Sequence, residues 1–361
     1  DGLIIDWYGS GNANSNVGDA TANQTNTAAM IADVGNYGLK YALAVEDASM
    51  SNPSANLSYA ATNYFPSANY IKLGDMRGGA APNANAPLAL DFEPFSWANP
   101  AVWNNMGNTK ALLTYYGQSW QTIPSVAGGE FMWPWPQGGQ GIVNGVQAWY
   151  NDLNTYYNGS FYTGGAPNIH NNYNSNGTGI YNNVVLGVAF PGFFDFYRGD
   201  AANFTDPNAG CCDQYGIIPR NYNGNTLSST LNLAKANQGV IDGIQIATWN
   251  DYSEGTEVEP TVEYGFQSLV TIQQFTGVPY VEKDLRYIDT LYMLRKQYSG
   301  NSAVQTELNT ASCDFASLQN TTAESILRCI VSTNGGTGCA NPSPSITSSL
   351  SASDSAGFAF N

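Results

Sequence analysis

The chain has 361 residues, of which 28 are acidic and 12 are Lys or Arg, so its net charge is −16 at pH 7. This balance argues against nucleic acids and anionic membranes as partners, because phosphate groups are bound by Lys and Arg, and no stretch of about 20 apolar residues is present to span a bilayer. Hydrophobic residues make up 43%, which indicates a globular protein, and the length suits one (β/α)8 barrel with long loops.

Short apolar runs that end in acidic or aromatic residues predict buried strands. They are residues 2–5, 39–45, 87–90, 123–127, 184–188 and 243–248. Near-continuous apolar runs are typical of parallel strands that are covered on both faces. Residues 28–37, 100–116 and 227–238 are predicted helices between these strands. This alternation indicates an α/β fold, and we expect a (β/α)8 TIM barrel.

The pattern changes after Pro260. Residues 262–275 and 282–298 are predicted helices, and the second has an apolar stripe made of Leu285, Ile288, Leu291, Met293 and Leu294. Beyond residue 299 the chain is rich in Ser, Thr and Asn, and from residue 341 it reads as a Ser/Pro/Ala-rich tail. We therefore predict a catalytic barrel over 1–298, a cysteine-containing extension packed on it over 299–340, and a tail over 341–361.

The five cysteines are Cys211, Cys212, Cys313, Cys329 and Cys339, and the one histidine is His170. Their spacing does not match a zinc site, so no metal is expected. An oxidising compartment would allow two disulfides and leave one thiol. Neighbouring Cys211 and Cys212 are poorly placed to bond each other, so we expect a stapled C-terminal segment, to which one of these two ties a loop.

Only 11% of the residues are charged, so the surface must be built from neutral polar side chains, as in many secreted proteins. We expect an extracellular monomer. Six Asn-x-Ser/Thr sequons, at Asn23, Asn56, Asn158, Asn176, Asn203 and Asn320, matter only in a eukaryotic secretory route. A phosphate-binding Gly-Lys-Ser/Thr loop and a dinucleotide fingerprint are both lacking, so we expect no cofactor.

The ends of the predicted strands carry the candidate binding residues, because active sites of barrels lie at the carboxyl ends of their strands. Acidic residues that could bind sugar hydroxyls are Asp6, Glu46, Asp47, Asp91, Glu93 and Glu130. Aromatic residues that could stack on the flat faces of sugar rings are Trp7, Tyr8, Trp97, Trp133, Trp135, Trp249 and Tyr252. The alternatives are helix capping for the acids and packing for Trp97 and Trp133.

Asp251 and Glu254 are the candidate catalytic pair. They lie three residues apart after the last predicted strand, and Gly255 and Thr256 indicate a turn that could point both carboxyl groups the same way. Glycoside hydrolysis generally needs two carboxyl groups, one of them as an acid. The alternative is that both carboxylates merely cap the following segment.

The stretch Thr-Trp-Asn-Asp-Tyr-Ser-Glu-Gly-Thr-Glu-Val-Glu-Pro over residues 248–260 resembles the last-strand signature of glycoside hydrolase family 71, the α-1,3-glucanases or mutanases. It is also similar to the related endo-α-mannosidase family 99. Asp251 favours family 71, whereas Gly255-Thr256 and the Glu-x-Glu-Pro that follows favour family 99. The likeness extends loosely over residues 1–298. It makes residues 2–8 the second barrel strand, so the first strand is missing or lies before residue 1.

The resemblance implies a secreted endo-acting hydrolase of a neutral α-linked polysaccharide, with α-1,3-glucan as the expected substrate. Asp is one methylene shorter than Glu, which leaves room for the water that inverting enzymes hold between carboxyl groups roughly 6.5–9.5 Å apart. We therefore expect inversion, with Glu254 as acid and Asp251 as base. Glu257 and Glu259 either bind substrate or organise this loop. The alternatives are an α-mannanase or other glycanase, and a non-catalytic glycan-binding barrel.

Overall fold

The computed structural model describes residues 2–77, 84–92, 100–103, 111–115, 127–134, 153, 184–194, 218–221, 224–238 and 241–340. It divides into two compact units, residues 1–259 and 260–361. The boundary predicted from the sequence lies after residue 298 instead. The helices predicted over 262–275 and 282–298 therefore belong to the second unit.

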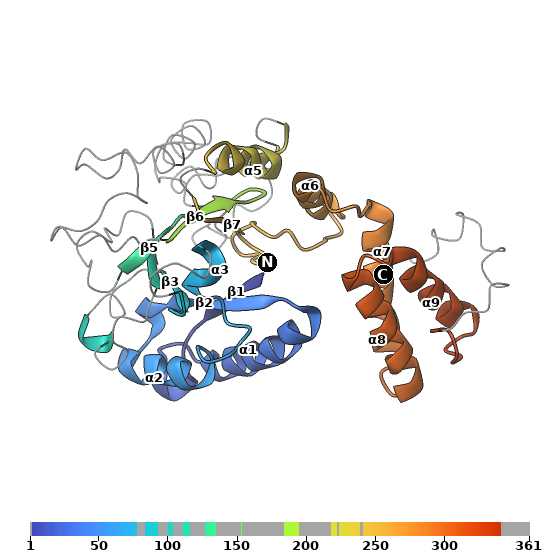
Figure 1. The fold of residues 1–361 in the computed structure, drawn as a ribbon, viewed down its shortest axis with the longest axis horizontal. Coiled ribbons are helices and arrows are strands. Elements are labelled where there is room, and N and C mark those ends of the chain that lie inside the picture. Colours follow the sequence, from blue (N-terminus) through green and yellow to red (C-terminus); the bar gives the residue numbers. More distant parts are fainter. Residues whose placement is uncertain are drawn as a thin grey trace, which may run out of the picture. The chain divides into compact units, whose positions relative to one another are not determined.

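A parallel sheet of seven strands forms the first unit (Figure 1). Its strands are β1 (Gly2–Trp7), β2 (Lys40–Glu46), β3 (Leu88–Phe92), β4 (Ala111–Tyr115), β5 (Ala127–Phe131), β6 (Val184–Ala189) and β7 (Gly243–Ile246). Each strand pairs with the next one in the chain. All the carboxyl ends therefore lie along one edge of the sheet.

This sheet confirms the predicted parallel α/β architecture. The strands follow one another in sequential order, whereas doubly wound sheets reverse their order at a switch point. Within the described ranges β1 and β7 are the end strands, so these residues do not form the expected closed eight-stranded barrel.

One predicted helix is wrong. Residues 100–116 contain a short 3₁₀ helix, η4 (Pro100–Trp103), and strand β4. Ala and Leu in Ala111–Tyr115 favour a helix by intrinsic propensity, but pairing with β3 and β5 on both sides overrides it. The run at 123–127 is also shifted, since strand β5 begins at Ala127.

The first unit also contains the helices α1 (Ala20–Val34), α2 (Pro53–Asn63), α3 (Leu73–Arg77) and α5 (Thr226–Ala236). The Asn52 side chain accepts a hydrogen bond from the N–H of Ala55, and Pro53 begins α2, where its missing N–H costs nothing. The Asn225 side chain caps α5 in the same way. Helix α1 starts eight residues before the predicted 28–37 helix and continues as the 3₁₀ helix η2 (Gly35–Tyr37).

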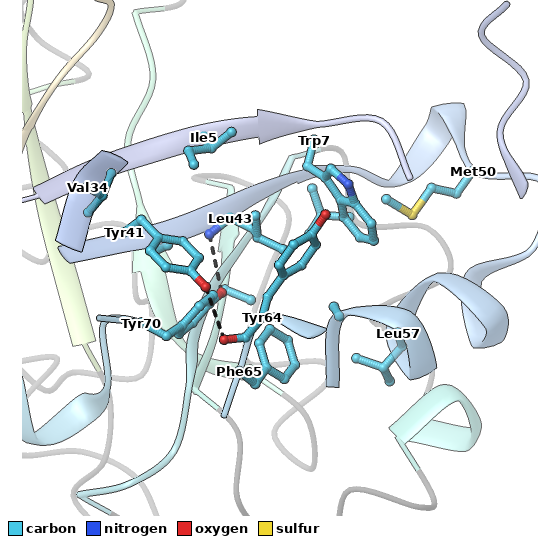
Figure 2. Close-up of a cluster of buried hydrophobic side chains, with 14 residues drawn as sticks. Ile5, Trp7, Val34, Tyr41, Leu43, Met50, Leu57, Tyr64, Phe65 and Tyr70 are labelled. Atoms are coloured by element: carbon cyan, nitrogen blue, oxygen red, sulfur yellow. Dashed lines mark hydrogen bonds between the residues drawn. The ribbon is translucent and has the colours of Figure 1, made fainter. Parts of the chain in front are cut away.

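The two faces of the sheet are distinguished by alternate residues. Tyr41, Leu43 and Val45 of β2 lie in one cluster with Val34 of α1 and Leu57 of α2 (Figure 2). Because side chains alternate along a strand, Ala44, which lies between Leu43 and Val45, points to the opposite face. We call that opposite face the inner face, and Ala44, Leu88 and Leu90 lie on it in a second cluster.

Asn56 connects α2 to the segment after β1. Its side chain is fully buried. Its Oδ1 accepts from the N–H and the hydroxyl of Ser10, both at 2.8 Å, and its Nδ2 donates to the carbonyl oxygen of Asn14 at 2.8 Å. This amide is therefore used within the fold, although it belongs to a glycosylation sequon.

Replacing Asn56 with Ala is expected to lower the free energy of unfolding by about 1–3 kcal/mol, because buried polar groups lose their partners. Denaturant unfolding of the purified protein measures this change. Asn63→Ala, at the exposed end of the same helix, is the matched control. Equal stability of the two variants would contradict the role of Asn56.

The second unit contains α6 (Gln267–Thr276), α7 (Glu282–Gln297), α8 (Ser302–Ala316) and α9 (Asn320–Ser332). Leu291 and Leu294 of α7 pack into a common core with α8 and α9, which explains why α7 belongs to this unit. The predicted apolar stripe is only partly buried. Leu285 is buried like Leu291 and Leu294, whereas Ile288 and Met293 are 39% and 48% exposed.

A disulfide joins Cys329 to Cys339. The carboxylate of Glu307 accepts hydrogen bonds from the N–H groups of Gly338 and Cys339, which fixes the same segment from α8. The expected staple in the C-terminal segment is therefore confirmed. Cys313 is an exposed thiol, and the predicted tie through Cys211 or Cys212 lies outside the described residues.

Candidate functional site

The loop of residues 248–259 follows β7 and carries Asp251 and Glu254. Its two ends are joined by backbone hydrogen bonds: the N–H of Thr248 donates to the carbonyl of Thr256 at 3.0 Å, and the N–H of Glu259 donates to the carbonyl of Trp249 at 2.9 Å. The peptide bond between Ala247 and Thr248 is cis. Because its ends are fixed, this 248–259 loop holds its central residues as a defined turn.

Asp251 organises that turn. Its Oδ1 accepts from the N–H of Ser253 at 2.9 Å and from the N–H of Glu254 at 3.0 Å, while its own N–H donates to Oγ1 of Thr248 at 2.9 Å. The capping alternative is therefore realised for one carboxylate oxygen, in the manner of an Asx turn. Any chemical role of Asp251 would use the other oxygen, Oδ2.

Glu254 is held by residues from distant parts of the chain. Trp133 donates from Nε1 to Oε2 of Glu254 at 3.2 Å, and the carbonyl of Glu254 accepts from the N–H of Phe194 at 2.7 Å. Gly255 has φ of 61°, and a Cβ there would lie 3.2 Å from Cβ of Phe194. A glycine is therefore needed directly after the candidate acid.

Arg220 holds the second half of the 248–259 loop, and the sequence pattern gave no reason to select this residue. Its guanidinium donates to the carbonyl of Gly255 at 3.1 Å and to the carbonyl of Glu257 at 3.0 Å, and it pairs with the Glu257 carboxylate. Tyr252 donates its hydroxyl hydrogen to Glu259 at 2.8 Å. Both glutamates therefore take part in organising the loop.

A second group of acids lies at the ends of β1 and β2. Asp6 is on the inner face, since its neighbours Ile5 and Trp7 pack on the helix side. Its carboxyl hydrogen-bonds with Tyr8 and Glu46 and interacts with the charge of Asp251. The loop after β7 and the end of β1 are thus brought together.

The end of β1 is fixed by Asn23 of α1, another residue that the sequence pattern gave no reason to select. Its Nδ2 donates to the carbonyl of Asp6 at 3.1 Å, and its Oδ1 accepts from the N–H of Tyr8 at 3.3 Å. The residues that flank Trp7 are therefore held on both sides by one amide.

Desolvation raises the pKa of Asp6 from 3.8 to about 6, and the charge of Asp251 adds to this rise, against the opposing hydrogen bonds from Tyr8 and Glu46. The residue as a whole is exposed, because β1 is an end strand of the described part of the sheet, whereas the carboxyl group itself is desolvated. The raised pKa means that the folded state favours the protonated carboxyl. The resulting stability is complete below pH 3.8 and is lost as the pH rises through about 6.

Asp6→Asn, a neutral replacement of similar shape, is expected to leave Tm unchanged near pH 4 and to raise Tm above the wild-type value at pH 7 and higher, because the ionised carboxyl is absent. Thermal unfolding across this pH range measures the difference. Asp33→Asn on the exposed surface of α1 is the control. A wild-type-like pH profile for Asp6→Asn would contradict the proposed titration.

Four of the candidate residues lie on the helix side of the sheet or directly after it. Trp7 is fully buried against Tyr59 and Tyr64, with ring centroids 6.4 and 5.8 Å away, so it has no open face for a ligand. Asp91 has the same parity as Ala89, which packs with the helices. The remaining two are Asp47, next to β2, and Glu130 of β5, and both are almost fully buried.

The carboxyl of Asp91 is fully buried, and both its oxygens lack a hydrogen-bond partner within the described ranges. Desolvation raises the pKa of Asp91 well above its usual value, with a further contribution from the charges of Asp47 and Glu46. Its position therefore favours a neutral acid in the core over direct contact with a substrate.

Two candidate aromatic residues are open to solvent. Trp249 and Tyr252, both on the 248–259 loop, are 52% and 51% exposed. They flank Asp251 in the sequence and leave apolar ring surface next to the candidate acids. Glu93, Trp97 and Trp135 lie outside the described residues.

The described ranges contain no group of three or more His, Cys, Asp or Glu side chains that could hold a metal ion. In those same ranges, none of the helices has both the length and the apolar character needed to cross a membrane.

The whole chain was compared with protein families, curated proteins and solved structures. No protein-family model matches the chain, and no curated protein matches it. A solved structure described as "Glycoside hydrolase-like protein" is similar over 76% of this chain and 80% of its own, with 14% sequence identity and a TM-score of 0.47. Activity and substrate do not follow from a likeness this distant.

Proposed function

We propose that this protein is a glycoside hydrolase that uses Glu254 as general acid and Asp251 as general base. The observation that carries the proposal is that one turn carries both carboxyl groups, with Glu254 bound by Trp133 and Asp251 near enough to Asp6 for their charges to interact. A pair of carboxyl groups is what cleavage of a glycosidic bond requires.

The proposed substrate is a neutral polysaccharide, with an α-1,3-glucan as the first choice from the resemblance of the 248–260 stretch. Exposed Trp249 and Tyr252 supply ring faces beside the acids. A chain of net charge −16 would repel uronate-rich or sulfated glycans. A related α-mannanase activity uses the same constellation, and we propose the extracellular space as the place of action.

The proposed mechanism inverts the anomeric centre. Glu254 gives a proton to the glycosidic oxygen as the bond to the anomeric carbon breaks, and the bonding electrons stay on that oxygen. Oδ2 of Asp251 removes a proton from the water that attacks the opposite face of the sugar. NMR of the first product formed reveals its anomer, and retention would exclude this mechanism.

The test of the function is incubation with a panel of α- and β-linked neutral polysaccharides, followed by product analysis. Release of oligosaccharides from an α-linked glucan or mannan supports the proposal. Binding without release from every glycan would favour the alternative of a glycan-binding protein, for which the same exposed aromatic residues suffice.

A further inference from the structure

Trp133 has a different environment from the other aromatic residues near the candidate acids. It is half-buried, between the buried residues Met132 and Pro134. Its ring meets Phe92 of β3 edge-on, with centroids 5.7 Å apart and an interplanar angle of 70°. By contrast, half of Trp249 is exposed. Trp133 is therefore held by packing and is not displayed as an open platform.

The backbone at Trp133 is also tied to the strand that leads into the catalytic loop. Nε2 of Gln245 on β7 donates to the carbonyl oxygen of Met132, and Gln245 is almost fully buried. Strand β7 thus fixes the residue before Trp133. It ends at Ile246, two residues before the 248–259 loop that holds Glu254. Both partners of the Trp133–Glu254 hydrogen bond are therefore connected to strand β7, Trp133 through the neighbouring Met132 and Glu254 through its loop.

The indole group determines which partner is the donor in this hydrogen bond. Trp has one N–H donor and no acceptor, so Trp133 can only donate to Oε2 of Glu254. In a protonated carboxyl group the carbonyl oxygen is a better acceptor than the hydroxyl oxygen, so a donor at Oε2 favours the form in which Oε2 is the carbonyl oxygen. The contact therefore leaves Oε1 as the oxygen that carries the proton of the acid form.

We propose that Trp133 is a positioning residue for Glu254: its indole N–H binds Oε2, so that Oε1 carries and delivers the proton to the glycosidic oxygen. This inference rests on the proposed function. The proton moves from Oε1 to the leaving oxygen, which takes the bonding electrons, and Glu254 is left as a carboxylate that Trp133 continues to bind. Phe92 supports the ring and does not touch the reacting atoms.

Trp133→Phe keeps an aromatic ring but removes the N–H. It is expected to lower kcat on the polysaccharide about 10- to 100-fold, the range of one hydrogen bond to a charged group, with KM nearly unchanged. The loss should be much smaller on the glycosyl fluoride of the released oligosaccharide, because fluoride needs little help from an acid to leave. Trp133→His, whose ring offers an N–H, should recover part of kcat on the polysaccharide.

Trp249→Phe is the matched comparison, and we expect it to raise KM more than it lowers kcat. Equal losses of Trp133→Phe on polysaccharide and fluoride, with Tm unchanged, would overturn the inference, as would wild-type kcat. If Trp133→Phe fails to fold, Phe92→Leu replaces it, with the same selective loss on the polysaccharide expected. Full activity of Glu254→Gln would instead overturn the proposed function, so the two failures are distinguishable.

Discussion

Glu254→Gln is expected to lower kcat by about 10²- to 10⁴-fold, the usual contribution of general acid catalysis, without weakening the binding of oligosaccharides. Gln has nearly the same shape as Glu, and its carbonyl oxygen can still accept from Nε1 of Trp133. It cannot deliver a proton to the leaving oxygen. Steady-state kinetics of sugar release from the polysaccharide measure kcat, and calorimetric titration with the product oligosaccharide measures binding.

The control for this variant is Glu263→Gln, the same change at an exposed position beyond the loop. It should match the wild type in kcat and in binding. If Glu254→Gln retained more than a tenth of wild-type kcat, the assignment of Glu254 as the acid would be wrong. Loss of both binding and Tm in that variant would assign it a structural role instead.

Two variants are needed to test Asp251, because its Oδ1 holds the turn and its Oδ2 is the proposed base. Asp251→Asn keeps an acceptor for the N–H groups of Ser253 and Glu254, so the turn should persist while the base is lost. We expect kcat to fall about 10²- to 10⁴-fold with little change in Tm. Asp251→Ala should show the same kinetic loss and, in addition, a cost of about 0.5–2 kcal/mol in unfolding free energy, as for a lost cap.

The comparison of the two variants separates catalysis from structure. Near-normal kcat in Asp251→Asn, with a defect only in Asp251→Ala, would restrict Asp251 to the turn. Asp6 would then be the next candidate for the base, because it lies on the inner face and interacts with Asp251. Kinetics of Asp6→Asn would decide between the two carboxyl groups.

The alternation of side chains along the strands explains on which face of the sheet most of the candidate residues lie. The sequence shows that Asp6, Trp7, Asp91 and Glu130 lie within or at the ends of apolar runs. It does not show which face of the sheet each one occupies, because runs covered on both faces lack alternation. Packing of α1 and α2 against Trp7 and Ala89 decides the question, and it leaves Asp6 on the inner face, where it interacts with Asp251 of the 248–259 loop.

The sequence by itself determined the parallel α/β class, because apolar runs are local features. Turn residues and carboxyl spacing are local too, and they led to the proposed pair Asp251 and Glu254 in the loop after the last strand. Only the tertiary structure decided that Ala111–Tyr115 is a strand, that Trp133 binds Glu254, and that Arg220 and Asn23 fix the surrounding segments. The partners of each of these lie far away in the sequence, and a single chain's pattern contains no signal for contacts that form only when distant strands meet.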